Sequence, residues 1–170
     1  MNSFIPTLIA VLLAEIGGRA TLFARVPRLA LAATLLGLAV SVAAFGGYSL
    51  SSTMNVQART LILGVALVLS GLGQLGKPVA ADPPATLMAT LLFVWRSGAP
   101  FLAFAFALWR SSPVGAAAGA LAGIIAAATL GIGLAGAVLP IHIIWVRRSA
   151  GILVTVVGIY ALLWALRVVG

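Results

Sequence analysis

Long runs of apolar residues, each near the length of a membrane-spanning helix, dominate the sequence. Six such runs cover residues 4–24, 29–50, 60–76, 85–109, 114–139 and 150–169. A helix needs about 20 apolar residues to cross a hydrocarbon core of roughly 30 Å, whereas transmembrane strands would be ~10 residues of alternating polarity. The pattern therefore predicts an all-α integral membrane protein with six transmembrane helices. The third run is the shortest, so its helix is expected to tilt less or to end in the interface.

A proline-rich stretch in the middle of the sequence, KPVAADPPA, divides the chain into two halves. The predicted division is residues 1–76, a linker at 77–84, and residues 85–170, with three helices in each half. If the halves are related, an odd number of crossings inserts the second half upside down, which gives two inverted three-helix repeats. Small residues at four-residue spacing predict close helix packing and also allow a homodimer, for which the sequence selects no face. They are Ala33, Gly37 and Ser41 in the second run, and Gly115, Gly119, Gly123, Ala127 and Gly131 in the fifth.

Composition strengthens the membrane prediction. The chain is 63% apolar and 7% charged, with a mean hydropathy of +1.24, which excludes a soluble domain. Its formal charge of +8 comes from basic residues scattered near expected helix ends, so membrane topology explains them better than nucleic-acid binding does. The distribution of these cations places both termini outside the cytoplasm. The first run lacks a basic leader and is expected to be a retained helix. The absence of cysteine excludes disulfides and thiolate metal sites.

Glu15 lies in the middle of the first apolar run, whereas the other acidic residue, Asp82, lies in the linker. A charge at that depth costs at least ~2.5 kcal/mol, so a partner or a functional role is expected. Within a continuous helix, Glu15 and Arg19 would share a face at the spacing that favours an ion pair. Gly17 and Gly18 would open space beside them against a neighbouring helix.

The second half holds a charge at a similar depth. Arg96 stands near the centre of the fourth run, and Pro100 would remove the helical hydrogen bond to its carbonyl and kink the helix. A broken helix at the midplane is typical of a substrate site between inverted repeats. The sequence therefore predicts a substrate pathway formed by Glu15, Gly17, Gly18, Arg19, Gln74, Arg96 and Ser97.

The segment AEIGGRA, residues 14–20, resembles a family motif, E-x-G-D-[KR]-[ST]. The motif occurs twice in a family of small manganese and calcium transporters of bacteria and the Golgi, within the superfamily of the lysine exporter LysE. Glu15, Gly17 and Arg19 match it, whereas Gly18 and Ala20 replace its aspartate and its hydroxyl residue. In the second half, VWRSGAPF can be laid over E-W-G-D-R-S-Q-F. Two positions then match, Trp95 and Phe101, and four depart, Val94, Arg96, Ser97 and Gly98.

The resemblance implies a manganese or calcium transporter, an antiporter that exchanges the ion for protons, in a bacterial inner membrane. Glu15 would be the metal ligand and proton carrier, helped by Ser97, Gln74 and backbone carbonyls. The metal would be cargo, and no resident cofactor is implied. This sequence retains one of the family's four acidic groups, and hard cations prefer several oxygen ligands.

An alternative makes Arg96 a built-in counter-ion to Glu15. The protein would then export an anion or zwitterion, or would be a membrane protein without transport activity. An enzyme is not expected, because the lone histidine, His142, has no acidic residue near it in the sequence.

Overall fold

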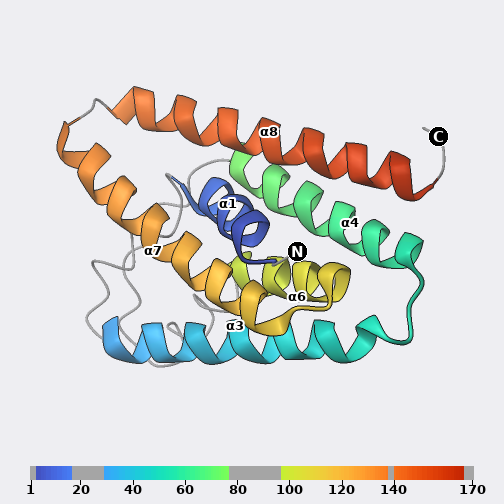
Figure 1. Cartoon of the computed structure of the whole chain (residues 1–170). Helices are drawn as coiled ribbons and strands as arrows, with labels where there is room; N and C mark the ends of the chain where they lie inside the picture. The colour runs from blue at the N-terminus through green and yellow to red at the C-terminus, as the bar shows by residue number, and fades with distance from the viewer. Residues whose placement is uncertain (1–2, 17–28, 77–96, 138–139, 167–170) are drawn as a thin grey trace.

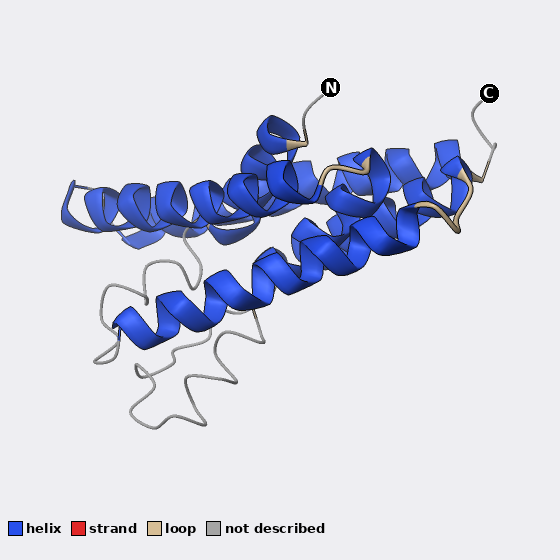
Figure 2. Cartoon of the chain, turned by 60° about the horizontal axis from the view of Figure 1, so that its bottom comes forward, coloured by secondary structure: helices blue, strands red, loops and turns tan. Residues whose placement is uncertain are grey.

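The computed structural model describes residues 3–16, 29–76, 97–137 and 140–166, and all regular structure in these ranges is helical (Figure 2). Short turns separate some of the helices. The described helices are α1 (Phe4–Glu15), α3 (Leu29–Ser51), α4 (Val56–Leu75), α6 (Ala99–Arg110), α7 (Pro113–Ala137) and α8 (Pro140–Ala165). The predicted all-helical class is therefore confirmed.

Four helices, α3, α4, α7 and α8, are long and apolar enough to cross a membrane. Between 28% and 39% of the residues in their most apolar windows are buried in the protein, so most of the apolar side chains point outward. Val42 and Val114, for example, are 71% and 69% exposed. Outward apolar surface on this scale fits a lipid environment and not water. The chain is a helical integral membrane protein.

The two short helices lie between the long ones. In Figure 1, α4 and α8 run side by side on one side, α3 runs along the opposite side, and α1 and α6 lie between them. The main packing pairs are α4 with α8, α1 with α7, and α3 with α6. Seven residues of α6 are buried, and α6 also contacts α1, α4 and α7. The core of the protein therefore forms around the short helix α6.

Glycines let the backbones of α4 and α8 touch. A Cβ atom at Gly158 would lie 2.7 Å from the backbone nitrogen of Val68 and 2.9 Å from the carbonyl oxygen of Gly64. Gly71 and Gly151 face each other in the same way farther along the pair. No side chain larger than hydrogen fits at such distances, so this contact depends on glycine from both helices.

The predicted small-residue stripe of the fifth run is confirmed where α7 packs on α1. A Cβ atom at Gly123 would lie 2.8 Å from the carbonyl oxygen of Leu8, and one at Gly119 would meet the carbonyl oxygen of Phe4. The stripe of the second run is wrong, because Gly37 has open space around it. A different face of α3 packs on α6, through buried Leu36, Val40 and Ala44 and through the close contact of Gly47 with Phe104.

Two predicted boundaries are also wrong. The third helix is not the shortest: α4 starts at Val56 and has 20 residues, because the Asn55 side chain caps it by accepting a hydrogen bond of 2.8 Å from the Ala58 N–H. The last helix starts at Pro140, where proline is well tolerated in a first turn. Arg147, Arg148 and His142 therefore belong to α8 and not to a loop or to the fifth helix.

The start of α1 and the end of α8 lie at the same end of the bundle. Ser3 Oγ donates to the Ser112 carbonyl at 2.8 Å, which ties α1 to the turn between α6 and α7. Arg59 Nη1 donates to Ser111 Oγ at 3.4 Å, which ties the start of α4 to the same turn. The glycine contacts make α8 antiparallel to α4, so α8 ends here as well. We call this region the Ser111 end.

Candidate functional site

Glu15 is the last residue of α1, and its side chain is only 6% exposed. The helix stops because Ile16 adopts an extended backbone, with φ −63° and ψ 129°. The 12 residues of α1 rise about 18 Å at ~1.5 Å per residue. Glu15 therefore lies about that far along α1 from the Ser111 end, which is more than half the roughly 30 Å thickness of a hydrocarbon core.

The Glu15 carboxylate closes the start of α6. Its Oε1 atom accepts hydrogen bonds from Ser97 Oγ at 3.0 Å and from the Gly98 N–H at 3.2 Å. Ser97 Oγ in turn accepts from the Ala99 N–H at 3.3 Å. The first N–H groups of a helix have no partner within it, and the helix dipole favours a negative charge there. The carboxylate therefore supplies, from another helix, the anion that the start of α6 favours.

The local sequence explains why α6 begins at this point. Gly98 is the residue before the helix, and Pro100 occupies its first turn, where the missing N–H of proline costs nothing. A Cβ atom at Gly98 would lie 3.5 Å from Ser70 Oγ, so α4 forms a third wall of the site. The site is thus a junction of α1, α4 and α6, in which the Ser97 hydroxyl contacts the carboxylate and the Ser70 hydroxyl lies beside Gly98.

The structure brings two of the predicted pathway residues, Glu15 and Ser97, into direct contact. The predicted pair of Glu15 with Arg19 stays a prediction, because Arg19 lies outside the described residues, and α1 ends at Glu15. Four of the other predicted positions lie outside the described residues; they are Gly17, Gly18, Arg19 and Arg96. The Gly98 N–H was not predicted; the nearest sequence signal is Pro100, because proline is common in the first turn of a helix.

Gln74 is buried, but its hydrogen bond joins it to a different cluster. Its Oε1 atom accepts from Arg147 Nε at 3.1 Å. Arg147 Nη2 also donates to the carbonyls of Gly73 at 3.3 Å and Gly76 at 3.1 Å. Those carbonyls lie at the end of α4, where a cation complements the helix dipole. Gln74 therefore helps to close α4 against α8, in a position that the prediction of a substrate contact did not anticipate.

Replacing Arg147 with alanine is expected to lower the free energy of unfolding by about 1–3 kcal/mol, because three acceptors at the end of α4 lose their donor. The neighbouring Arg148 is exposed, so Arg148→Ala should change it by less than ~0.5 kcal/mol. Unfolding by sodium dodecyl sulfate, added stepwise to protein in a mild detergent, measures the free energy of unfolding of both variants. Equal losses in the two variants would contradict the capping role.

The described residues contain no group of three or more histidine, cysteine, aspartate or glutamate side chains that could hold a metal. Calcium takes six to eight oxygen ligands, and carboxylates are the strongest of them. In the described part of the site, an ion bound at Glu15 would have to draw its other ligands from hydroxyl and carbonyl oxygens, of which the Ser97 hydroxyl is in direct contact with the carboxylate.

Comparison with known proteins gave no match, whether with protein-family models, with curated proteins or with solved structures. The resemblance to manganese and calcium transporters stays a prediction from the motif around Glu15. Function has to be argued from the chemistry of the buried carboxylate.

Proposed function

We propose that the protein is a transporter of a small cation and that Glu15 binds the ion or the proton exchanged for it. One observation carries the proposal: a buried carboxylate at the end of α1 accepts hydrogen bonds from Ser97 and from the Gly98 N–H at the start of α6. Ionisable groups at this depth are expensive, and in membrane proteins they commonly mark ion or proton pathways.

The two short helices support this function. Backbone outside regular helices is tolerated at membrane depth only where protein buries it or where it lines a cavity. Here α1 ends and α6 begins beside the same carboxylate. Transporters built from repeats commonly place their substrate site where helices are interrupted, and the meeting of these two helix ends fits that pattern.

We also propose two inverted three-helix halves. The pseudo-two-fold axis of such a repeat exchanges the first described helices of the two halves, α1 and α6. It likewise exchanges α3 with α7 and α4 with α8. The observed packing of α1 on α7, α3 on α6 and α4 on α8 follows that exchange. This pattern supports the proposal and leaves the site between the halves.

Binding at Glu15 would couple to motion through the start of α6. The ionised carboxylate favours that helix end, whereas protonation removes its charge. An ion that coordinates the carboxylate competes with the donors from Ser97 and Gly98. Exchange of an ion for a proton thus changes how strongly α1 holds α6, and a ligand that binds two conformations unequally shifts their populations.

Manganese and calcium are the first ions to test, because the motif around Glu15 resembles that of transporters for these ions. Both are hard cations that prefer oxygen ligands, as the neighbouring hydroxyls are. Exchange for protons requires a membrane that carries a proton gradient, and a bacterial inner membrane is the proposed location.

A second candidate keeps the site and changes the cargo. Ser97, which directly follows Arg96 in the sequence, contacts Glu15. If Arg96 is the counter-ion of Glu15, the protein would move an anion or zwitterion, or would serve as a membrane partner without transport.

Ion flux in proteoliposomes tests the proposal. Manganese and calcium uptake by the wild-type protein should exceed uptake by protein-free vesicles and should rise when a pH gradient is imposed. Uptake equal to that of protein-free vesicles for both ions, in either pH condition, would overturn cation transport. Uptake of anions or amino acids by the same vesicles would then favour the second candidate.

A further inference from the structure

An apolar groove of about 530 Å³ lies between α1, α4, α6 and α8. Its lining comes from all four helices and includes Pro6, Ile9, Leu63, Phe106, Val154 and Trp164. Some of these side chains are buried, such as Leu63, whereas Ile9 and Trp164 are about half exposed, at 48% and 47%. The groove therefore has a buried floor and open sides. Since these helices belong to a membrane protein, its opening faces lipid.

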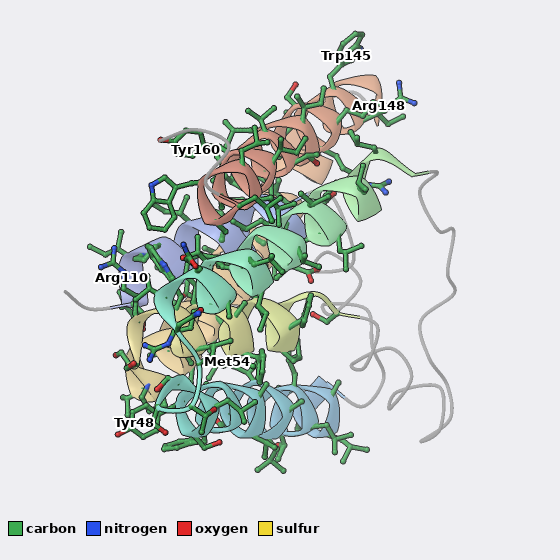
Figure 3. All side chains as sticks on the ribbon, turned by 90° about the vertical axis from the view of Figure 1, so that its right-hand side faces the viewer. Tyr48, Met54, Arg110, Trp145, Arg148 and Tyr160 are labelled. Carbon is green, nitrogen blue, oxygen red and sulfur yellow. The ribbon has the colours of Figure 1, made fainter. Side chains whose placement is uncertain are left out.

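Aromatic and cationic side chains gather where the groove reaches the Ser111 end. Trp109, Tyr160 and Trp164 line it there, close to the ends of α6 and α8. The Arg110 guanidinium lies 3.9 Å from the centre of the Trp109 ring. Figure 3 shows Arg110 on α6 and Tyr160 on α8 on the same side of the bundle. Aromatic residues of this kind favour the headgroup region of a bilayer.

A second arginine borders the same region. Arg59 precedes Thr60, which lines the groove, and it donates to Ser111, which follows Arg110 in the sequence. Among the described residues the only carboxylate side chain is Glu15, which lies at the other end of α1. Two arginines thus lie at the Ser111 end of the groove, one of them stacked on its lining residue Trp109, and the described chain places no acidic side chain beside them.

We propose that this groove binds an anionic phospholipid, with an acyl chain along the apolar floor and the phosphate beside Arg110 and Arg59. The occupant must bring an apolar tail and a negative head together, and an anionic lipid does both. A second copy of this chain would instead bring arginines against arginines, since its formal net charge is +8. Arginine is well suited to phosphate because its planar fork can donate two parallel hydrogen bonds.

Native mass spectrometry can test the preference. Protein released from vesicles with equal amounts of phosphatidylglycerol and phosphatidylcholine should retain the anionic lipid about tenfold more, a difference of ~1.4 kcal/mol. Arg110→Gln should reduce this preference several-fold. The matched Arg148→Gln variant, which removes an exposed charge outside the groove, should retain it. Equal losses in both variants would show general charge attraction and overturn the site.

A separate experiment tests the contribution of the apolar groove lining to lipid binding. Ala161→Phe adds bulk to the groove lining and should reduce retention of lipid while leaving both arginines in place. Inorganic phosphate at millimolar concentration should not displace the lipid, because it lacks the acyl chain. Displacement by phosphate alone would overturn a lipid site in favour of a simple anion site. A stable dimer whose formation excludes lipid from the groove would also overturn the proposal.

The arginine variants could weaken folding, so a measurement on the wild-type protein is included. Its melting temperature should be higher in phosphatidylglycerol than in phosphatidylcholine, since a ligand that binds the folded state stabilises it. Identical melting temperatures in the two lipids would count against the site even if no variant folds.

Discussion

Glu15→Gln is expected to fold like the wild-type protein and to lose ion flux at least about tenfold. Glutamine has nearly the shape of glutamate, and its amide oxygen can still accept from Ser97 and the Gly98 N–H. It carries no charge and releases no proton at physiological pH, so it can neither attract a cation strongly nor exchange a proton. The loss of a charge at a helix start costs about 0.3–2 kcal/mol, which a folded bundle should survive.

Parallel measurements of flux and of the unfolding free energy separate the two effects. Asp82→Asn makes the same chemical change at the chain's other acidic residue, in the predicted linker, and should retain flux. Wild-type flux in Glu15→Gln would remove this carboxylate from the transport mechanism. If wild-type protein carries flux and both variants lose it, the charge of the chain matters rather than the site.

Gly71→Leu is expected to lower the free energy of unfolding by ~3 kcal/mol or more, or to prevent folding. A Cβ atom at Gly71 would meet the Thr155 hydroxyl and would lie 2.7 Å from both the Gly151 carbonyl oxygen and the Thr155 nitrogen. These are backbone atoms of α8, so relief requires the two helices to move apart. Overpacked cores typically lose 1–3 kcal/mol, and a backbone contact leaves less room than a side-chain contact.

Gly73→Leu is the matched control, because Gly73 lies two residues from Gly71 on α4 and a Cβ atom added there has nothing within 4 Å. It makes the same change in side-chain size and helix propensity on an exposed face. Size-exclusion chromatography and detergent titration should find this variant folded and as stable as the wild-type protein. If the two leucine variants lose stability equally, the glycine contact between α4 and α8 contributes no specific packing energy.

The sequence was enough to predict the helical membrane class, but it did not select the packed face of α3. Nearly every position of that helix is apolar, so polarity does not mark an inner side. Small residues occur on several faces of α3. The stripe through Gly37 therefore looked as suitable for helix packing as the face with Val40, which is the one that packs. On α7 the stripe includes two glycines that meet α1, Gly119 and Gly123, and there the same reasoning succeeded.

The candidate site was predictable only in part, for a different reason. Glu15 stood out because an acidic residue in an apolar run has few explanations. The Gly98 N–H did not, because a backbone donor has no side-chain signature and its availability depends on where α6 begins. The hydrogen bond of Gln74 to Arg147 was not predicted, because an amide can bond to many partners. Its partner Arg147 was expected in a loop, until α8 was found to begin at Pro140.

The capping of α6 by Glu15 has a consequence for how the protein is made. The carboxylate and Ser97 are 82 residues apart in the chain. At about 5–20 residues per second, a ribosome needs roughly 4–16 seconds to produce that separation. The first segment must therefore enter the bilayer before the donors from Ser97 and Gly98 exist. Nascent chains that stop before the fourth segment would keep a carboxylate in lipid without these two hydrogen bonds. Such truncated chains would be expected substrates of the cell's membrane proteases.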